Sequence, residues 1–207
     1  MTIGKGTSWG SPRQLPAGSP VLDSDASLFH WLNSANSSDS ANSTASRSDV
    51  GLTGGSLWSM LGGPSCVGRI TTSESVGYPC DVVDVRTDVG EFRFIASLAA
   101  HTLTWSLAVL AMNVQDFGGF RFGHRAHPGD GLVDIYQADL PVQQRFLVAK
   151  RARLGAHLPH PFIREQRVAR ADVTLRRPVR FWLDGVACGR SASFALRVEP
   201  DALTVIF

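Results

Sequence analysis

From residue 79 to the C-terminus, the sequence is a succession of short β-type segments separated by turn residues, and this pattern restricts the fold more than any other feature. Segments such as CDVVDV (80–85) and VRFWL (179–183) are rich in β-branched and aromatic residues, which favour strands. The apolar run LTWSLAVLAMNV (103–114) is too short and too often interrupted by polar residues to span a membrane. It predicts instead a central strand that is buried on both faces.

One helix is expected within this series of strands. It begins near Pro141, because proline fits the first helical position, and Gly155 follows its last turn. Val142, Phe146 and Ala149 share one face of this helix. The remaining strands are predicted in EFRFIASLAA (91–100), LVDIYQA (132–138), RVARADVTL (167–175), SFALRV (193–198) and ALTVIF (202–207).

The first 78 residues have a different pattern. A short helix through Leu28 and Leu32 is capped by the preceding Asp-Ser-Asp, and the segment 50–63 reads as a very short strand, a glycine turn and a second helix. Between them lies a segment of 15 residues, 34–48, that contains seven serines and predicts a flexible insertion, because its side chains bury too little surface to offset their ordering entropy. The fold class is therefore predicted as α+β: a small α/β remnant (1–78) precedes a mostly antiparallel, β-sandwich-like domain (79–207) with one helix.

The distribution of charge indicates the kind of partner. The net charge is +2, but residues 121–197 carry 14 Lys/Arg against 6 Asp/Glu, which leaves 6 against 12 for the rest. A basic second half favours anionic partners such as phosphates or an anionic membrane surface. No helix-turn-helix, zinc finger or aromatic RNA-binding strand is recognisable, so no nucleic acid partner is expected. The N-terminal MTIGKGTSWGSPRQ has no apolar signal region, and we expect a cytoplasmic protein, peripheral at the membrane if it binds lipid.

Cysteine and histidine patterns give little support for a metal. Cys66, Cys80 and Cys188 are odd in number and widely spaced, which predicts reduced thiols rather than a disulfide framework or a zinc site. Two His-x-x-His pairs, 124/127 and 157/160, lie beside proline and glycine in predicted loops. Neither pair lies on a helix that would aim two imidazoles at one ion, and no third ligand has a recognisable spacing, so they are interpreted as loop histidines.

The segment FWLDGVACGRSASF (181–194) contains the most ambiguous residue of the chain. An Asp-Gly pair between two strands is the strongest short-range signal for a hairpin turn. Asp184 is therefore interpreted from its local sequence as a turn residue, and a reactive role needs support from elsewhere in the chain.

That support comes from the order of several short motifs. The sequence contains Asn113 with Gly118-Gly119, then AHPGDGLVD (126–134), a helix, LGAH (154–157), WLDG (182–185) and EPDAL (199–203). In this order, they resemble the C-terminal β-domain of the bacterial diacylglycerol and lipid kinase family, which is related in fold to the NAD kinases. The resemblance covers about residues 81 to 207.

The N-terminal part resembles the nucleotide-binding domain of the same family in truncated form. In the family, a strand leads into a G-G-D-G-T loop that binds ATP phosphates through its backbone N–H groups. Gly54 and Gly55 match the first two glycines, and Ser56 stands where the family has its aspartate. Because only about fifty residues precede this loop, we expect the preceding half of the usual nucleotide domain to be missing.

The resemblance also implies roles for residues of the β-domain. Asp130 would supply a carboxylate to Mg²⁺, with the backbone carbonyls of His127 and Leu132 beside it, and hard oxygen ligands of this kind suit magnesium. Asp184 would lie at the phosphate-transfer centre. The family's catalytic base is the glutamate of a D-G-E triplet, but this chain has Val186 at that position, and valine cannot accept a proton.

Three functions are compatible with these observations. The favoured one is a degenerate lipid kinase, inactive or weakly active, that binds a lipid, a nucleotide or a protein partner. A second is an active ATP-dependent lipid kinase, completed by a homodimer or another chain. The sequence leaves open whether Asp84, Asp88 or Glu91 compensates for Ser56 and Val186, since no motif supports them. The third is a purely structural interaction module.

Overall fold

The computed structural model describes residues 9–34, 48–63, 68–156 and 158–207. Its strands are β1 (Ser11–Pro12), β2 (Val21–Leu22), β3 (Ser48–Leu52), β4 (Val76–Thr87), β5 (Gly90–Phe94), β6 (Ser97–His101), β7 (Leu107–Met112), β8 (Val133–Asp139), β9 (Ile163–Val168), β10 (Arg170–Leu183) and β11 (Val186–Ile206). Its helices are α1 (Asp25–Ser34), α2 (Gly55–Met60), the 3₁₀ turn η3 (Arg69–Thr71) and α3 (Val142–Ala152). The predicted α+β class with a mostly antiparallel sheet is confirmed.

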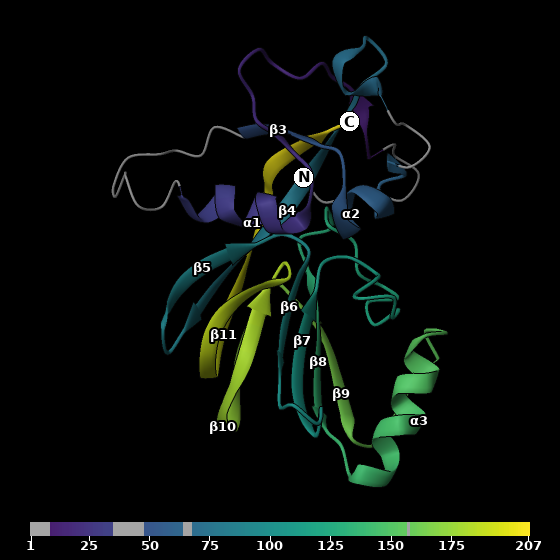
Figure 1. Cartoon of the computed structure of the whole chain (residues 1–207), viewed down its shortest axis with the longest axis vertical. Coiled ribbons are helices and arrows are strands. Elements are labelled where there is room, and N and C mark those ends of the chain that lie inside the picture. Colours follow the sequence, from purple (N-terminus) through teal and green to yellow (C-terminus); the bar gives the residue numbers. More distant parts are fainter. Residues whose placement is uncertain (1–8, 35–47, 64–67, 157) are drawn as a thin grey trace.

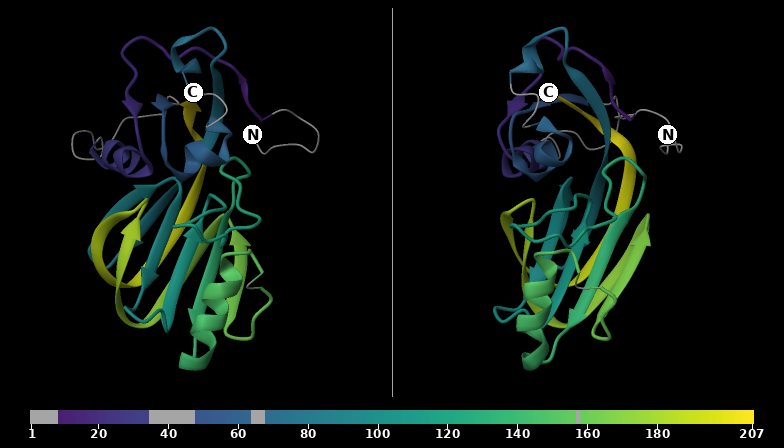
Figure 2. Two further views of the ribbon diagram at one scale, coloured as in Figure 1. Left: turned by 45° about the vertical axis from the view of Figure 1, so that its right-hand side comes forward. Right: turned by 90° about the vertical axis from the view of Figure 1, so that its right-hand side faces the viewer.

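The strands form one strongly curved sheet in the order β1-β4-β11-β10-β6-β7-β8-β9, with β5 on β4 and β3 on β11 (Figures 1 and 2). The sheet curls around an apolar interior to which β4–β8, β10 and β11 contribute alternate side chains, as expected for a sandwich-like packing. β7 is buried along its whole length, which confirms the central strand expected from its apolar run.

The N-terminal part, described over residues 9–34 and 48–63, is joined to this sheet by the far ends of two of its long strands, β4 and β11. β4 and β11 pair antiparallel over two stretches, separated by a bulge between Glu199 and Leu203. Beyond the bulge, β11 also pairs in parallel with β3, so the helical part and the sandwich share two continuous strands. The division at residue 78 falls within β4 and stays a prediction. The serine-rich residues 35–47 lie outside the described residues.

The N-terminal helices lie over one end of the sandwich (Figure 1). Ser24 caps α1 by accepting the Ser27 N–H at 3.2 Å, as the sequence predicted. At its other end, Asn33 exchanges hydrogen bonds with the backbone of Arg93 on β5. α1 therefore closes the end of the sandwich, and it brings its first turn close to α2.

The structure corrects two of these expectations and adds one observation on the predicted helix. The segment 91–100 is two strands, because the N–H groups of Ile95 and Ala96 bond to a side chain instead of a neighbouring strand. β9 was missed because IREQRV is a polar edge strand without an apolar period. On α3, the apolar face of Val142 and Phe146 points to solvent, and the helix buries Val148 and Ala152 instead. No helix among the described residues is long and apolar enough to cross a membrane.

Candidate functional site

A polar cavity of about 1120 Å³ lies where the two N-terminal helices meet the loops of the sandwich. It brings together four residues that the sequence singled out, although they are separated by up to 129 positions: Gly55, Ser56, His127 and Asp184. Other walls come from α1, α2 and the loop after β7, including Asp25, Ser59, Gln115, Asp116 and Arg121. Asp130, Leu132 and Val186 are not among the residues that line it.

The glycine turn before α2 is closed by a carboxylate of the chain itself. Asp25, at the first turn of α1, accepts the N–H of Ser56 at 2.6 Å and that of Leu57 at 3.3 Å. A Cβ on Gly55 would lie 2.4 Å from the Asp25 Oδ1 atom, so glycine is needed for the carboxylate to come this close. The N–H groups that could face a phosphate are therefore bound to Asp25.

Asp184 is held as a structural residue of the β10–β11 turn. Both Asp184 (φ 49°) and Gly185 (φ 84°) have positive φ, as the tight hairpin turn requires. The Asp184 carboxylate accepts three backbone N–H groups, those of Ile95 at 2.9 Å and of Ala96 and Ser97 at 2.8 Å each. Burial raises the pKa of Asp184 to about 7, while the hydrogen bonds from these N–H groups act in the opposite direction.

Val186 starts β11 on the other side of that turn. Its half-buried side chain packs against the apolar interior of the sandwich. The position that holds the catalytic glutamate in the resembled family is therefore filled by a packing residue. This environment is unsuitable for a carboxylate, because burying a charge without a partner is costly.

The predicted metal loop is closed by an arginine. The Asp130 carboxylate accepts the Leu132 N–H at 3.0 Å and pairs with the guanidinium of Arg167 on β9. The Nε atom of Arg167 also lies 3.6 Å from Asp134, whose side chain is 1% exposed. Burial raises the pKa of Asp134, and the charge of Arg167 lowers it. Arg167 therefore supplies the positive charge that these two carboxylates require.

The side chain of His127 makes a packing contact and a turn contact, while the predicted role of its backbone carbonyl as a metal ligand stays a prediction. Its Nδ1 atom accepts the Gly129 N–H at 3.2 Å, and its ring lies 4.4 Å from that of Trp9. Its pKa is lowered by burial. Within the described ranges, no group of three or more His, Cys, Asp or Glu side chains is arranged to hold a metal ion. His157 lies outside these ranges.

Asp81, which sequence reasoning missed, ties together two segments of the sandwich that are far apart in the sequence. Its carboxylate accepts the Gly131 N–H at 2.6 Å and the Asp201 N–H at 3.0 Å, so it joins the 126–132 loop to the β11 bulge. Burial raises the pKa of Asp81 to about 6. The sequence did contain one signal for this role, because Asp81 directly precedes the apolar segment VVDV. An acid at such a place is expected to be buried, and a buried acid needs specific hydrogen-bond partners.

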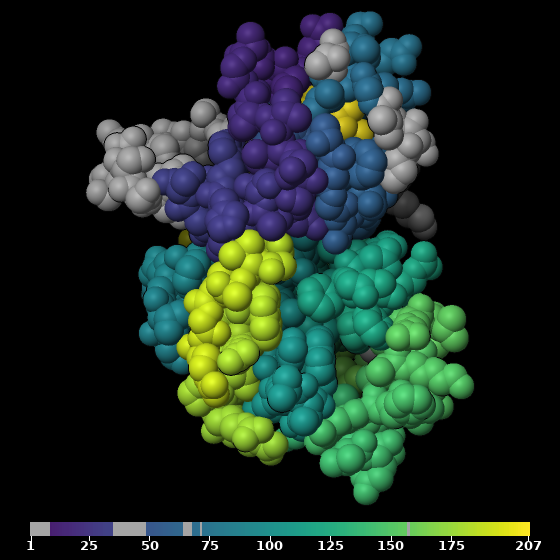
Figure 3. Space-filling view, in the orientation of Figure 1, coloured from purple at the N-terminus to yellow at the C-terminus, as the bar shows by residue number. Residues whose placement is uncertain are grey.

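A second cavity, of about 660 Å³, lies between α3 and the outer face of β7 and β8. Figure 3 shows a hollow between α3 and the neighbouring strands in this part of the molecule. Its walls are almost entirely apolar and include four phenylalanines and a tryptophan; polar side chains come from Thr104, Tyr136 and Arg145. The aromatic residues are Trp105, Phe117, Phe120, Phe122, Tyr136 and Phe146.

Comparison with solved structures identifies the fold. The chain matches "a putative diacylglycerol kinase" from Bacillus anthracis str. Sterne with a TM-score of 0.67 and 12% identity, covering 91% of this chain and 77% of that one. Two further diacylglycerol kinase structures from the same organism match with TM-scores of 0.60 and 0.57 at 11% and 13% identity. They cover 78% of this chain each, and 70% and 67% of those chains.

No protein-family model matches the sequence, and comparison with curated proteins finds no match. The structural likeness confirms, at the level of the fold, the resemblance inferred from the order of the motifs. At this level of identity, it establishes the fold alone, so the function has to be argued from the sites.

Proposed function

We propose that this chain is a lipid-binding protein with the fold of a diacylglycerol kinase, and that it does not transfer phosphate. The observation that carries the proposal is the contrast between its two cavities. The polar cavity has its glycine turn closed by Asp25, while the apolar cavity beside α3 is open and lined by aromatic and aliphatic side chains.

The apolar cavity has the size and chemistry for an acyl chain. Its volume of about 660 Å³ lies within the range of pockets that bind small molecules. Each methylene group moved from water into such a cavity contributes about 0.8 kcal/mol. The guanidinium of Arg145 at the wall can bind the polar or anionic end of the lipid. That end would lie near the mouth of the cavity, where it keeps its contact with water and avoids the cost of burial.

Nucleotide phosphates do not fit the glycine turn in this arrangement. A phosphate would have to displace Asp25 from the N–H groups of Ser56 and Leu57, and the displaced carboxylate would remain close by and repel it. Ser56 replaces the family's aspartate at this loop. The ATP that the family resemblance implies therefore has no prepared site at this turn.

Mg²⁺ does not fit the Asp130 loop for the opposite reason. The guanidinium of Arg167 already contacts the Asp130 carboxylate, and a divalent cation brought to the same group would be repelled by that positive charge. Val186 also replaces the catalytic glutamate of the family. Phosphoryl transfer depends mostly on positioning the substrates and neutralising their charge, and this chain lacks the residues that would do either.

Lipid binding is tested by quenching of tryptophan fluorescence with a brominated stearate, because Trp105 lines the cavity. Saturable quenching is expected for the wild type. Ala149→Phe, which fills the cavity mouth, should weaken binding by about tenfold, equivalent to 1.4 kcal/mol. Gln143→Phe places the same side chain on α3 outside the cavity and should leave the affinity unchanged.

The absence of saturable quenching, or equal effects of the two substitutions, would refute lipid binding in this cavity.

Catalysis is tested separately by calorimetry with Mg²⁺-ATP and by a phosphorylation assay with diacylglycerol. We expect neither binding heat nor product. ATP-dependent phosphorylation of diacylglycerol by the purified chain would overturn the second half of the proposal.

A further inference from the structure

The exposed apolar side chains of this protein are concentrated around α3. Of the eight large hydrophobic residues that are exposed among the described residues, five lie in α3 or shortly after it, and a sixth lies in the β6–β7 turn. Phe146 is 83% exposed and Leu103, in that turn, is 96% exposed. The others on this side are Val142, Leu147, Leu154 and Phe162. Such a concentration marks an interaction surface, whereas scattered exposed residues would not.

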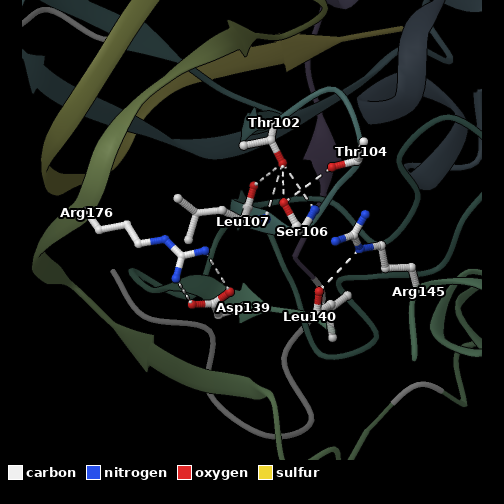
Figure 4. Close-up of polar contacts among 8 residues, drawn as sticks. All are labelled: Thr102, Thr104, Ser106, Leu107, Asp139, Leu140, Arg145 and Arg176. Carbon is white, nitrogen blue, oxygen red and sulfur yellow. Dashed lines mark hydrogen bonds and ion pairs between the residues drawn. The ribbon is translucent and has the colours of Figure 1, made fainter. Parts of the chain in front are cut away.

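The same part of the chain is strongly basic. Residues 140–164 contain one lysine and four arginines and no aspartate or glutamate. Lys150, Arg151, Arg153 and Arg164 are exposed, and Lys150 follows Phe146 by one helical turn. Asp139, the carboxylate immediately before this segment, is neutralised by Arg176 through hydrogen bonds of 2.9 and 3.3 Å (Figure 4). The surface therefore presents apolar side chains among exposed positive charges.

Hydrogen bonds fix the backbone of the two segments that carry Leu103 and Phe146. The Thr102 hydroxyl accepts the N–H groups of Ser106 and Leu107 and fixes the turn that carries Leu103 (Figure 4). The Leu140 N–H donates to the Ser106 carbonyl at 2.7 Å, and Arg145 Nε donates to the Leu140 carbonyl at 3.2 Å. The β6–β7 turn and the first turn of α3 are thus joined, and both lie at the end of the molecule away from the C-terminus (Figures 1 and 2).

We propose that α3 and the β6–β7 turn form a docking surface for an anionic lipid bilayer, with Phe146 and Leu103 entering the head-group region. A helix with exposed apolar residues and flanking lysines and arginines is suited to lie at a membrane surface. The charge argues against a second copy of this chain as the occupant, because two such surfaces would bring like charges together. The inference goes beyond lipid binding, and docking does not require an occupied cavity.

Continuity with the apolar cavity gives the docking surface a role. Phe146 is exposed to solvent and also lines the cavity, as do Val142 and Ala149 on the same helical face. A bilayer seated on this face would lie at the cavity mouth. An acyl chain could then pass from the bilayer into the protein without crossing water, which avoids the cost of exposing its methylene groups.

The test is co-sedimentation of the purified full chain with vesicles. Vesicles of phosphatidylglycerol and phosphatidylcholine in equal parts are compared with vesicles of phosphatidylcholine alone. We expect binding to the mixed vesicles that weakens with added salt. Phe146→Gln and Leu103→Gln should each lower the partition coefficient by about tenfold, and Lys150→Gln should lower it by about fivefold.

Val89→Gln is the matched control, because Val89 is 54% exposed and lies in the β4–β5 turn, outside this surface. It should bind vesicles as the wild type does. Failure of the wild type to bind the mixed vesicles, or equal loss in the Val89 control, would overturn the proposal. A wild-type dimer in analytical ultracentrifugation that Phe146→Gln dissociates would also overturn it.

A further measurement separates failure of docking from failure of lipid binding. Since Leu103 does not line the cavity, Leu103→Gln should retain full stearate quenching.

Discussion

Replacement of Asp184 tests directly whether this residue is structural or reactive. In Asp184→Ala, the N–H groups of Ile95, Ala96 and Ser97 lose their acceptor, and all three residues are buried. An unsatisfied buried N–H costs about 1–3 kcal/mol, and alanine at positive φ adds about 1 kcal/mol. Allowing for relaxation of the loop, we expect a loss of about 4 kcal/mol in the free energy of unfolding.

Asp184→Asn provides the graded comparison. Asparagine tolerates positive φ, and its carbonyl oxygen can still accept the N–H groups of Ala96 and Ser97, which share the Oδ1 atom of Asp184. The N–H of Ile95 would then face an amide NH₂ group, so the expected loss is about 2 kcal/mol. Asparagine should therefore be clearly less disruptive than alanine.

Urea unfolding monitored by circular dichroism at pH 7 measures both variants. A loss of this size is a large part of the stability of an ordinary domain. If Asp184→Ala does not fold for this reason, Asp184→Asn still gives a measurable midpoint. A loss below about 1 kcal/mol in either variant would contradict the reasoning from the hydrogen bonds. It would indicate that the carboxylate is held loosely and is available for chemistry.

Three further predictions concern other charged residues. Asp25→Ala should lower the free energy of unfolding by about 1–2 kcal/mol, because α2 loses the acceptor at its first turn, as urea unfolding would show. Arg167→Met leaves the buried Asp134 without its cation and should cost about 3 kcal/mol; added Mg²⁺ should raise the melting temperature of this variant but not that of the wild type. Because burial raises the folded-state pKa of Asp81 to about 6 and of Asp184 to about 7, the folded state binds more protons than the unfolded state from about pH 4 to these values. Stability should therefore fall as pH rises through this window, by roughly 1.4 kcal/mol per pH unit for each group, and Asp81→Asn should reduce that slope in urea titrations between pH 4.5 and 7.5.

Local sequence was sufficient for features that depend on neighbouring residues. The Ser24 cap of α1, the Asp184-Gly185 turn and the buried strand β7 all follow from residues within a few positions of one another. The order of short motifs also identified the fold that comparison with solved structures confirms.

Features that depend on distant partners could not be predicted from local patterns. Asp25 meets Ser56 across 31 positions, and Asp184 meets Ile95 across 89. The interruption of the expected strand 91–100 also depends on a distant partner. The N–H groups of Ile95 and Ala96, which would pair with a neighbouring strand, donate to Asp184 instead. The exposed face of α3 was missed because an apolar stripe on a helix ordinarily faces a core.

The two cavities differ in whether their polar groups already have partners within the protein when no ligand is bound. A site for an exchangeable ion leaves donors or carboxylates without partners in the free protein, and buried polar groups without partners are costly. Here the N–H groups at the glycine turn are satisfied by Asp25, and Asp130 is satisfied by Arg167, so binding a phosphate or a cation would first have to break an internal contact. The apolar cavity is lined mostly by apolar side chains, so an acyl chain can enter it without separating a charged group from its partner. Ligand binding therefore breaks fewer internal contacts in the cavity beside α3 than in the polar cavity. This favours lipid binding over nucleotide binding as the function.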